Sequence, residues 1–375
     1  MLNLLNYTED LLARHIWRDK LSIIIYGAGM IGKIIIPSFL KKNNLLDFLK
    51  CYIDADECKQ QEKIQVDCKA YDIYSPDYLN NISKNSILFI TNSNYAAVLN
   101  MLDGIYNLNG MDAVIIPVLQ ILGLKQNEEK YELINYELEK IPKVINYCWF
   151  SGKDMPQYLV KCIESWKRKC PDYEVKRWDE SNYDINKNKY MSDAYGEKKW
   201  GFVPDYARLD ILYNYGGFYL DTDVELLESL DKFREQGAFC GVEKWGNINM
   251  GGCSGAVPGH PMIKKLLDYR ENIPFKLDNG RLNLETCGIY ETTPMILEGM
   301  RVDNSIQRIH GMTVFSSDFF HPYDYMSEQT IITSNTVSIH HFNGGWLDDN
   351  LKQMRKKTAE QYISILKRME CTGKE

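Results

Sequence analysis

Apolar runs and amphipathic stretches alternate along the first third of the chain. The run LSIIIY at 21–26 has the length and β-branched content of a buried parallel strand, and GAGMIG followed by KIIIPSFLKKNN predicts a turn that enters a helix. Later strands are expected in CYIDADE, ILFITNS and AVIIPVLQIL, with a helix over NYAAVLNMLDGIYNLN before the last of them. Strands that alternate with helices predict an α/β domain built on a doubly wound parallel sheet, which we place at 1–125.

A second alternating pattern starts at Ile141, after a charged stretch. Residues 126–140 carry apolar positions at helical spacing and end at Ile141-Pro142, which predicts a linker helix. Further strands are expected in KVINYCWF, YEVKRWD, FYLDTD, AFCGVE and TVSIHHF, and helices in PQYLVKCIESWKRK and from about 203 to 215. We place the second domain at 141–346 and predict a basic amphipathic helix at 347–375.

The composition is that of a globular protein with a substantial core, because 45% of the 375 residues are hydrophobic and 25% are charged. The formal net charge of -7 argues against nucleic acid as a partner. The ten cysteines include no C-x-x-C pair, which favours a reduced, cytoplasmic chain. The N-terminus lacks the apolar core of a secretory signal, and the most apolar run is too short to cross a bilayer. The basic C-terminal helix leaves open a peripheral contact with the inner face of a membrane.

Two aspartates separated by one residue follow an apolar strand in GGFYLDTDVE. In extended geometry the carboxylates of Asp221 and Asp223 would project to the same side and share one cation. Mg²⁺ and Mn²⁺ bind one or two carboxylates together with substrate phosphate oxygens, so the pattern suits a nucleotide diphosphate ligand. A solvated acidic turn is the alternative, since a bare D-x-D is common.

A charged pair precedes the double aspartate on the predicted helix. Asp205 and Arg208 lie three residues apart and hence on one helix face, where a carboxylate and a guanidinium could hold sugar hydroxyls. A surface ion pair of small energetic weight is the alternative. The turn at Gly216-Gly217 leads from this helix into the strand before Asp221, so the two charged pairs are expected to meet.

Four motifs follow one another in the second half of the chain: IPKVINYCWFSGK, PDYEVKRWD, DYARLDILYNYGGFYLDTDVE and HHFNGGW. In this order they resemble the glycosyltransferases that carry the DXD sugar-binding region, among them enzymes of capsular and surface polysaccharide synthesis, with the large clostridial glucosylating toxins as distant relatives. The resemblance implies a GT-A type nucleotide-sugar transferase domain that moves a hexose from a UDP-sugar to a glycan or lipid-linked glycan acceptor. It also implies Mn²⁺ or Mg²⁺ as cofactor and retention of the anomeric configuration.

The resemblance assigns donor-binding roles to single residues. Trp149 matches a tryptophan that stacks on the uracil ring, and Trp346 matches one near the β-phosphate on a closing loop. Asp205 and Arg208 match the pair that holds the transferred sugar. Tyr219 stands where an aromatic residue lines the pocket.

The metal ligands follow from the same resemblance. Asp221 matches a residue that reaches ribose and sugar hydroxyls, and Asp223 matches the direct metal ligand. Either His340 or His341 would complete the metal sphere. The chain departs from the pattern at two places: ETTPMIL replaces a Thr-Gly-Pro-like turn, and Pro204 replaces a small hydroxyl residue. Because of these departures, the resemblance does not identify the sugar donor. Asn249 is expected either to line the acceptor side or to cap the end of a strand.

The GAGMIG turn has a strand before it and a helix after it, which is the context of a phosphate-binding turn. Gly27, Gly29 and Gly32 could cradle phosphates, and Asp54 follows at the place of a ribose contact. The region resembles the Rossmann-like domains appended to sugar-modifying and polysaccharide-synthesis enzymes, which implies a second nucleotide site. A scaffold without ligand is the alternative.

Two other functions fit part of the pattern. The glycine turn, together with the Tyr-x-x-x-Lys spacing of Tyr195 and Lys199, would suit an NAD-dependent nucleotide-sugar epimerase or reductase. That function explains neither the double aspartate nor HHFNGGW. A non-catalytic nucleotide-sugar sensor would need the same binding groups as the transferase and would bind without turnover.

Overall fold

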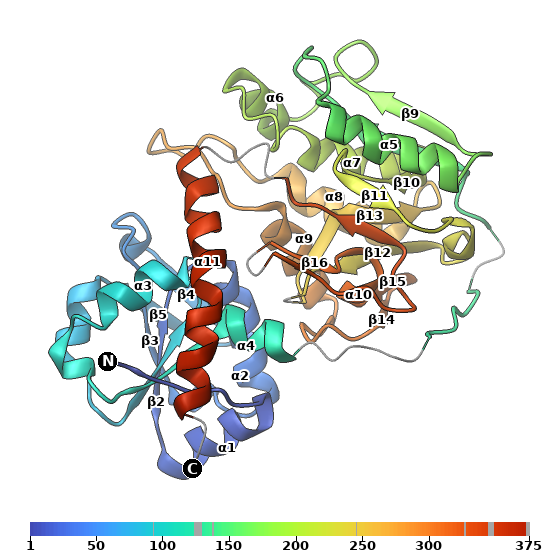
Figure 1. Cartoon of the computed structure of the whole chain (residues 1–375). Helices are drawn as coiled ribbons and strands as arrows, with labels where there is room; N and C mark the ends of the chain where they lie inside the picture. The colour runs from blue at the N-terminus through green and yellow to red at the C-terminus, as the bar shows by residue number, and fades with distance from the viewer. Residues whose placement is uncertain are drawn as a thin grey trace. The chain divides into compact units, whose positions relative to one another are not determined.

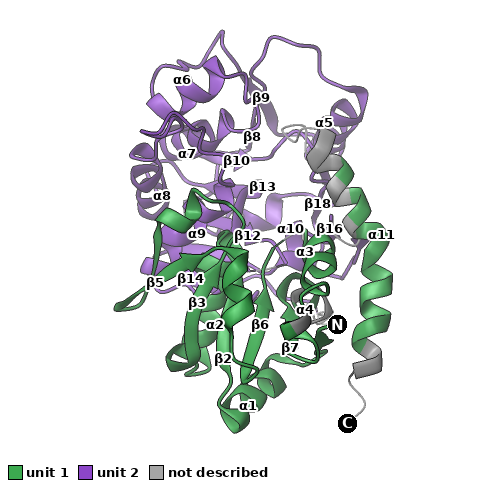
Figure 2. Ribbon diagram, turned by 90° about the vertical axis from the view of Figure 1, so that its left-hand side faces the viewer, with its two compact units in different colours: residues 1–125, 326–328, 349–375 green, residues 126–325, 329–348 purple. Residues whose placement is uncertain are grey.

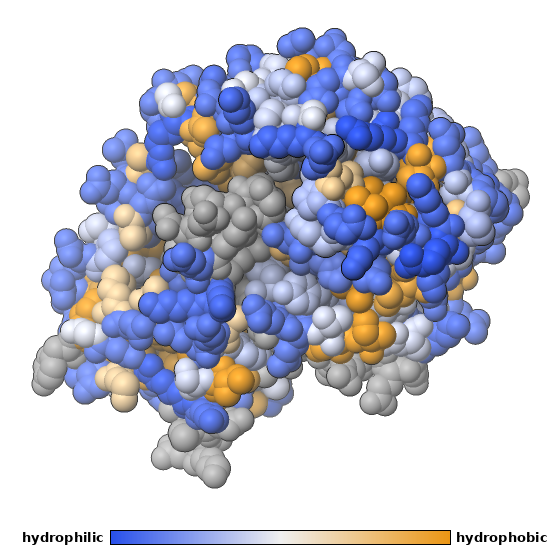
Figure 3. All heavy atoms as spheres, turned by 45° about the horizontal axis from the view of Figure 1, so that its top comes forward, coloured by the Kyte–Doolittle hydropathy of each residue, from blue (hydrophilic) through white to orange (hydrophobic). Residues whose placement is uncertain are grey.

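The computed structural model describes residues 1–375 except 93, 124–129, 137–138, 245, 326–327, 344–348 and 373–375. The chain forms two compact units (Figure 2): Met1–Lys125 with Met326–Glu328 and Asp349–Glu375, and Gln126–Tyr325 with Gln329–Asp348. On the face shown in Figure 3, hydrophilic residues predominate and apolar residues gather in small groups.

The first unit is built on a sheet of order β1-β7-β6-β2-β3-β5-β4 (Figure 1). Its strands pair in parallel except β4 with β5. From β2 the chain passes to β3 on one side and returns to β6 on the other, so the strand order reverses at β2 and the predicted α/β class is confirmed. The strands are β1 (Asn3–Leu4), β2 (Ser22–Tyr26), β3 (Leu49–Ile53), β4 (Lys63–Val66), β5 (Lys69–Tyr74), β6 (Ser86–Ile90) and β7 (Asp112–Ile115).

The helices of the first unit follow the strands closely. They are α1 (Glu9–Asp19), a π-helical turn (Ile31–Ile35) continued by α2 (Ile36–Lys42), α3 (Tyr95–Leu102), α4 (Ile116–Gly123) and α11 (Asp349–Thr372). The strand predicted over AVIIPVLQIL is wrong beyond Ile115, because α4 starts there with Pro117 in its first turn. Proline has a helical φ and lacks the N–H that the first turn leaves unpaired, so it starts a helix and cannot continue a central strand.

The C-terminal helix α11 belongs to the first unit. It contacts α3 and β1 and buries Tyr362, Ile365 and Met369. Arg368 anchors it, since one guanidinium nitrogen lies 2.6 Å from a carboxylate oxygen of Asp103 and another donates to the carbonyl of Leu2. Among the described residues, no helix is both long and apolar enough to cross a membrane.

The second unit holds a mixed sheet of order β14-β15-β12-β13-β10-β8-β9. Because β13 runs antiparallel to both β10 and β12, the strands β8, β9, β10, β12 and β15 all point the same way, and their carboxyl ends meet at one edge. The strands are β8 (Val144–Cys148), β9 (Glu174–Trp178), β10 (Gly217–Tyr219), β12 (Ala238–Val242), β13 (Ile248–Ala256), β14 (Gln307–Ile309) and β15 (Met312–Phe315). Two small ribbons pair β11 (Val224–Leu226) with β18 (Ser338–His340), and β16 (Tyr323–Asp324) with β17 (Gln329–Thr330).

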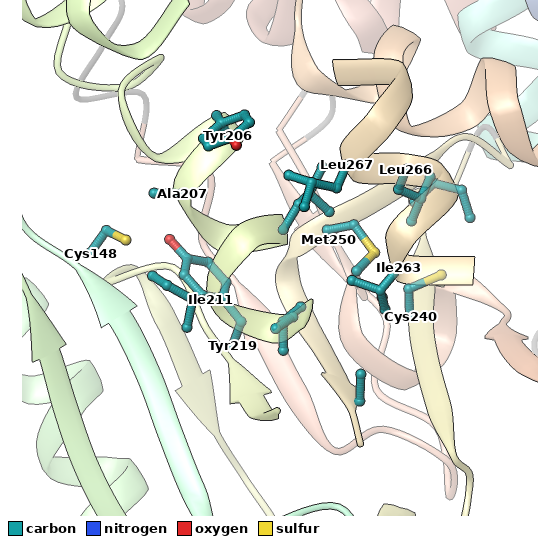
Figure 4. Close-up of a cluster of buried hydrophobic side chains, with 14 of the residues drawn as sticks. Cys148, Tyr206, Ala207, Ile211, Tyr219, Cys240, Met250, Ile263, Leu266 and Leu267 are labelled. Carbon is teal, nitrogen blue, oxygen red and sulfur yellow. The ribbon is translucent and has the colours of Figure 1, made fainter. Parts of the chain in front are cut away.

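The helices of this unit are α5 (Gln157–Lys169), α6 (Lys189–Gly196), α7 (Pro204–Tyr215), α8 (Pro261–Glu271), α9 (Cys287–Leu297) and α10 (Ser317–Phe320). Helix α7 is buried all round, with eight successive buried residues from Asp205 to Leu212. Figure 4 shows its apolar residues in a cluster with α8 and the sheet, including Tyr206, Ile211 and Leu266. Its charged side chains therefore lie inside the protein, where they need partners.

The linker helix predicted over 126–140 is wrong in its described part, because residues 130–136 are not helical. Their polar groups bond to the second unit instead. Tyr131 N donates to Asn335 Oδ1, Tyr136 N donates to the carbonyl of Glu235, and the carbonyl of Ile134 accepts from Gln236. These tertiary hydrogen bonds replace the bonds within a helix on which the prediction relied.

Candidate active site

The double aspartate lies in a turn at the carboxyl edge of the second sheet. Strand β10 ends at Tyr219, and the chain turns at 221–224, where Val224 N donates to the carbonyl of Asp221 at 3.0 Å. The prediction that the two carboxylates project from one extended strand is therefore wrong. The turn arises because Asp221 N pairs with the carbonyl of Gly251 at 2.7 Å, after which the chain leaves the sheet to form β11.

Asp223 contacts the segment that contains β18. Its Oδ1 lies 3.3 Å from Nε2 of His340, and its Oδ2 accepts from the backbone of Asn343 at 2.9 Å. Pairing of β11 with β18 sets this contact, since Val224 lies opposite His340. Burial raises the pKa of Asp223, but His340 and the hydrogen bonds outweigh it and the pKa is lowered. Burial lowers the pKa of His340, yet the Asp223 carboxylate outweighs it and the pKa is raised.

The two neighbouring histidines have different partners. His340 is buried and contacts Asp223, whereas Nε2 of the half-exposed His341 lies 3.1 Å from Glu225. The ring of Phe342 stacks on that of His340 with centroids 4.0 Å apart. A third histidine, His321, lies 5.6 Å from His340 between ring centroids and was not singled out from the sequence.

The charged pair of α7 lies beside the same turn. Arg208 Nη2 is 3.5 Å from Asp205 Oδ1 and 3.4 Å from Asp221 Oδ1, so the guanidinium links the two predicted pairs. Asp205 is only 4% exposed and Arg208 only 3%, which excludes the surface ion pair considered as the alternative. Burial raises the pKa of Asp205, although Arg270 on α8 and Arg208 act against it.

Three further side chains complete this network, and the sequence did not point to them. Arg270 on α8 lies 2.9 Å from Asp205, and its guanidinium carbon lies 3.9 Å from the centroid of the Tyr190 ring. Glu291 on α9 lies 3.3 Å from Arg208. Burial raises the pKa of Glu291 to about 7, against the pull of Arg208. Glu291 is the first residue of the ETTPMIL segment, which departs from the expected pattern. This departure marks the segment as unusual but does not single out Glu291.

The predicted aromatic residues have unequal exposure. Tyr219 is buried, its ring centroid lies 5.5 Å from the Arg208 guanidinium carbon, and its hydroxyl lies toward Cys148 (Figure 4). Burial raises the pKa of Tyr219 well above its usual range. Trp149 follows β8 at the same edge, is partly exposed, and donates its indole N–H to the carbonyl of Lys153 at 2.8 Å. Trp346 lies outside the described residues.

Asn249 caps backbone at this edge. Its Oδ1 accepts from the N–H groups of both Gly251 and Gly252, and its amide donates to Glu243. These bonds fix the segment that accepts from Asp221. The strand-capping alternative for Asn249 is thereby observed.

The residues present fit a divalent cation only in part. Asp223 and His340 approach each other at 3.3 Å, about the separation of two ligands of one small cation with bonds of roughly 2.1 Å. In the described part of the chain, no group of three or more His, Cys, Asp and Glu side chains is arranged to hold a metal ion. A cation here would therefore need oxygen ligands from a substrate, as Mg²⁺ sites commonly do.

The GAGMIG turn of the first unit is bonded to Asp54, which follows the neighbouring strand β3. The Asp54 carboxylate accepts from the backbone of Ala28 at 2.7 Å and of Asp56 at 2.9 Å. A Cβ on Gly32 would lie 2.1 Å from the carbonyl oxygen of Gly27, so that glycine lets the helix approach the turn. A Cβ on Gly29 would meet nothing within 4 Å.

The second unit is thus an α/β fold whose buried charges gather beside the aspartate turn at the carboxyl edge of its sheet. Residues 156–240 match the family described as "Glycosyltransferase sugar-binding region containing DXD motif". That segment includes α7, β10 and both aspartates of the turn.

Known proteins are similar over parts of the chain. Inositol phosphoceramide mannosyltransferase 3 of Schizosaccharomyces pombe is 30% identical over 175 residues, which cover 44% of this chain and 46% of the relative. An uncharacterised glycosyltransferase of Acanthamoeba polyphaga mimivirus is 29% identical over 238 residues, 60% of this chain and 91% of the relative. The chain spans less than half the length of the yeast relatives it matches.

Solved structures with similarity include the PaToxG glycosyltransferase, with a TM-score of 0.36 and 18% identity over 43% of this chain and 71% of that one. Another is the galactosyltransferase LgtC in complex with donor and acceptor sugar analogs, with a TM-score of 0.30 and 14% identity over 59% of this chain and 95% of that one.

Proposed function

We propose that the second unit is a metal-dependent, retaining GT-A type glycosyltransferase that moves a hexose from a UDP-sugar to a glycan or lipid-linked glycan. The proposed setting is capsular or surface polysaccharide synthesis on the cytoplasmic side of a membrane. One observation carries the proposal: Arg208 joins Asp205 to Asp221 inside the protein, and Asp223 two residues further on contacts His340.

Asp205 and Arg208 would hold the transferred sugar. A buried carboxylate and guanidinium fixed by several partners can bind hydroxyls without first being ordered, which lowers the entropic cost of binding. Asp205 is held by Arg208 of its own helix α7 and by Arg270 of α8, so its position does not depend on the donor. Arg208 would also stabilise the charge that develops on the leaving group.

Asp221, Asp223 and His340 would hold the cation together with phosphate oxygens of the donor. Mn²⁺ or Mg²⁺ bound there would neutralise the diphosphate as the glycosidic bond breaks. The Asp223 carboxylate keeps its negative charge because its pKa is lowered, and the Asn343 N–H fixes its second oxygen.

Trp149 would bind the base. It is partly exposed at the carboxyl end of β8, and its indole N–H bond to Lys153 fixes the ring plane. An aromatic face in that position suits stacking on uracil. Trp346 would close over the β-phosphate. Attack of an acceptor hydroxyl on the face from which the diphosphate departs would retain the configuration without a covalent intermediate.

The test is a panel of nucleotide sugars offered to the purified full-length chain. It should include UDP-hexoses and GDP-mannose, because the yeast relatives are named mannosyltransferases. We expect slow hydrolysis of one UDP-hexose that requires Mn²⁺ or Mg²⁺. If GDP-mannose were the only sugar nucleotide turned over, the proposed UDP-hexose donor would be wrong. Tight binding without any turnover, with acceptors present, would favour the sensor over the transferase.

The NAD-dependent alternative gains nothing from the geometry. The Tyr195 hydroxyl donates to Glu180 at 3.1 Å. A short-range hydrogen bond therefore accounts for Tyr195. Oxidation of a nucleotide sugar with reduction of NAD⁺, catalysed by the chain, would restore that alternative.

A further inference from the structure

Helix α9 is joined to β13 through a charged side chain. Oε2 of Glu291 accepts from the backbone of Met250 at 2.8 Å, and the next residue, Thr292, accepts from the backbone of Ile248 at 2.9 Å. The register between β12 and β13 jumps from Cys240–Ser254 to Gly241–Asn249. Met250 thus lies in a stretch without a partner on β12, and Glu291 supplies the acceptor that a strand would otherwise provide.

The other oxygen of Glu291 points to the site. Oε1 lies 3.3 Å from Nη1 of Arg208, whose Nη2 lies 3.4 Å from Asp221. Glu291 is 2% exposed, so water screens this pairing little. One buried carboxylate therefore bridges a strand backbone and the guanidinium that faces the aspartate turn.

The strand end of this bridge also leads to Asp221. Gly251, next to Met250, accepts from the backbone of Asp221 at 2.7 Å. A Cβ on Gly251 would come within 2.1 Å of Asp221 Oδ2, so the carboxylate lies directly against this backbone. Any shift of Met250 would pass to Asp221 through this contact.

We propose that Glu291 is a positioning residue of the transferase site, which holds both the Arg208 guanidinium and the Met250-Gly251 backbone against Asp221. This rests on the proposed function and adds a residue that acts through Arg208 and Asp221 rather than on the donor. An uncharged residue at 291 would leave Arg208 with Asp205 and Asp221 as its anionic partners among the described residues.

The ionisation of Glu291 provides a readout that packing alone would not. Burial raises its pKa to about 7. The groups that face it are Arg208 and Asp205 on α7, Arg270 on α8, the Met250 N–H on β13, and the thiols of Cys240 on β12 and Cys287 on α9. Since the ionised form holds the guanidinium, turnover should fall as pH drops below about 7.

The test compares Glu291→Gln with Thr292→Val in the full chain. Glutamine keeps the size of the side chain and an oxygen for Met250 N, but loses the charge toward Arg208. Valine at 292 removes the neighbouring hydrogen bond to β13 and leaves Arg208 untouched. The readouts are kcat and KM for the UDP-hexose between pH 5.5 and 8.5, the thermal midpoint, and crystal structures of both variants.

We expect Glu291→Gln to lower kcat roughly 10- to 100-fold, as loss of a supporting residue behind a direct ligand does. The donor KM should change less, the low-pH decline should disappear, and Arg208 should move from Asp221 in the crystal. Thr292→Val should lower the thermal midpoint and keep kcat. Unchanged kcat and an unmoved Arg208 in Glu291→Gln would overturn the proposal, as would an equal loss in Thr292→Val. If the wild-type chain turned over no nucleotide sugar, the proposed function would fail, and the Arg208 position in the two crystals would still decide this inference.

Discussion

The two units each place a turn at the carboxyl end of a parallel strand, yet the turns differ in what surrounds their carboxylates. In the first unit, the Asp54 carboxylate accepts from the backbone N–H groups of Ala28 and Asp56 and lies 3.6 Å from the ammonium of Lys59. In the second unit, Asp221 and Asp223 meet charged side chains from other elements, Arg208 and His340. The Asp54 carboxylate is thus held mainly by backbone N–H groups, whereas Asp221 and Asp223 face charged side chains from α7 and β18, a convergence of side chains that is typical of a site.

The largest effect is expected at Asp223. Asp223→Asn keeps the shape but loses the charge for a cation, and we expect kcat to fall roughly 100-fold or more, as for loss of one group that stabilises developing charge. Metal-dependent hydrolysis of the UDP-hexose measures it, with Asp231→Asn as the matched change of an acidic residue that pairs with Lys143 instead. Full metal-stimulated turnover in a folded Asp223→Asn would remove the distinction between the two turns.

Trp149 tests the donor end of the same site. Trp149→Ala should weaken UDP binding by ~1 to 3 kcal/mol, the cost of losing an aromatic stacking surface for a base. Calorimetric titration of UDP in the presence of Mn²⁺ measures it. Trp149→Phe is the matched control and should recover most of the affinity. An unchanged Kd in the alanine variant would make Trp149 a structural residue.

Glu291 gives a prediction on stability. Its pKa is about 7 in the folded chain and near 4.3 when unfolded, so the folded state binds the proton more tightly. This tighter proton binding stabilises the folded state. The stabilisation is fully present below the unfolded pKa and is lost as pH rises through the folded pKa of about 7. The stability of the wild type relative to Glu291→Gln should therefore decline between pH 5 and 8 in urea unfolding. A constant difference across this range would contradict the raised pKa.

The smallest effect is expected at Gly29, in the glycine turn of the first unit. Gly29→Ala should leave the thermal midpoint unchanged, because its Cβ would meet nothing within 4 Å. Gly32→Ala is the matched change and should lower it, since its Cβ would collide with the Gly27 carbonyl. Nucleotide binding that Gly29→Phe abolishes would show that this turn is a second site; absence of binding in the wild type would leave it a scaffold.

The sequence pattern predicted the elements better than their contacts. The run at 21–26 and the helix from 203 to 215 are β2 and α7 within a residue or two, because buried apolar runs and helix boundaries are local signals. The stretch at 130–136 was predicted as helix from the same kind of signal, but tertiary hydrogen bonds decide its conformation.

The candidate site shows the same limit. Asp205, Arg208 and Asp221 were named because they lie near one another in the sequence. Glu291 was missed because 83 residues separate it from Arg208, and only the docking of α9 on β13 brings the two together. Side chains recruited over such separations carry no periodic or spacing signal in one sequence.

The role of the aspartate turn can be measured by calorimetric titration of UDP into the full-length chain, with and without Mn²⁺, in the wild type and in Asp223→Asn. If the aspartate turn is a nucleotide-sugar site, the wild type should bind UDP more tightly with Mn²⁺ than without it. Asp223→Asn should lose this dependence, while its affinity for UDP without Mn²⁺ should change little. Equal affinities with and without Mn²⁺ in the wild type, unaffected by Asp223→Asn, would show that the aspartate turn is not a metal-dependent nucleotide-sugar site.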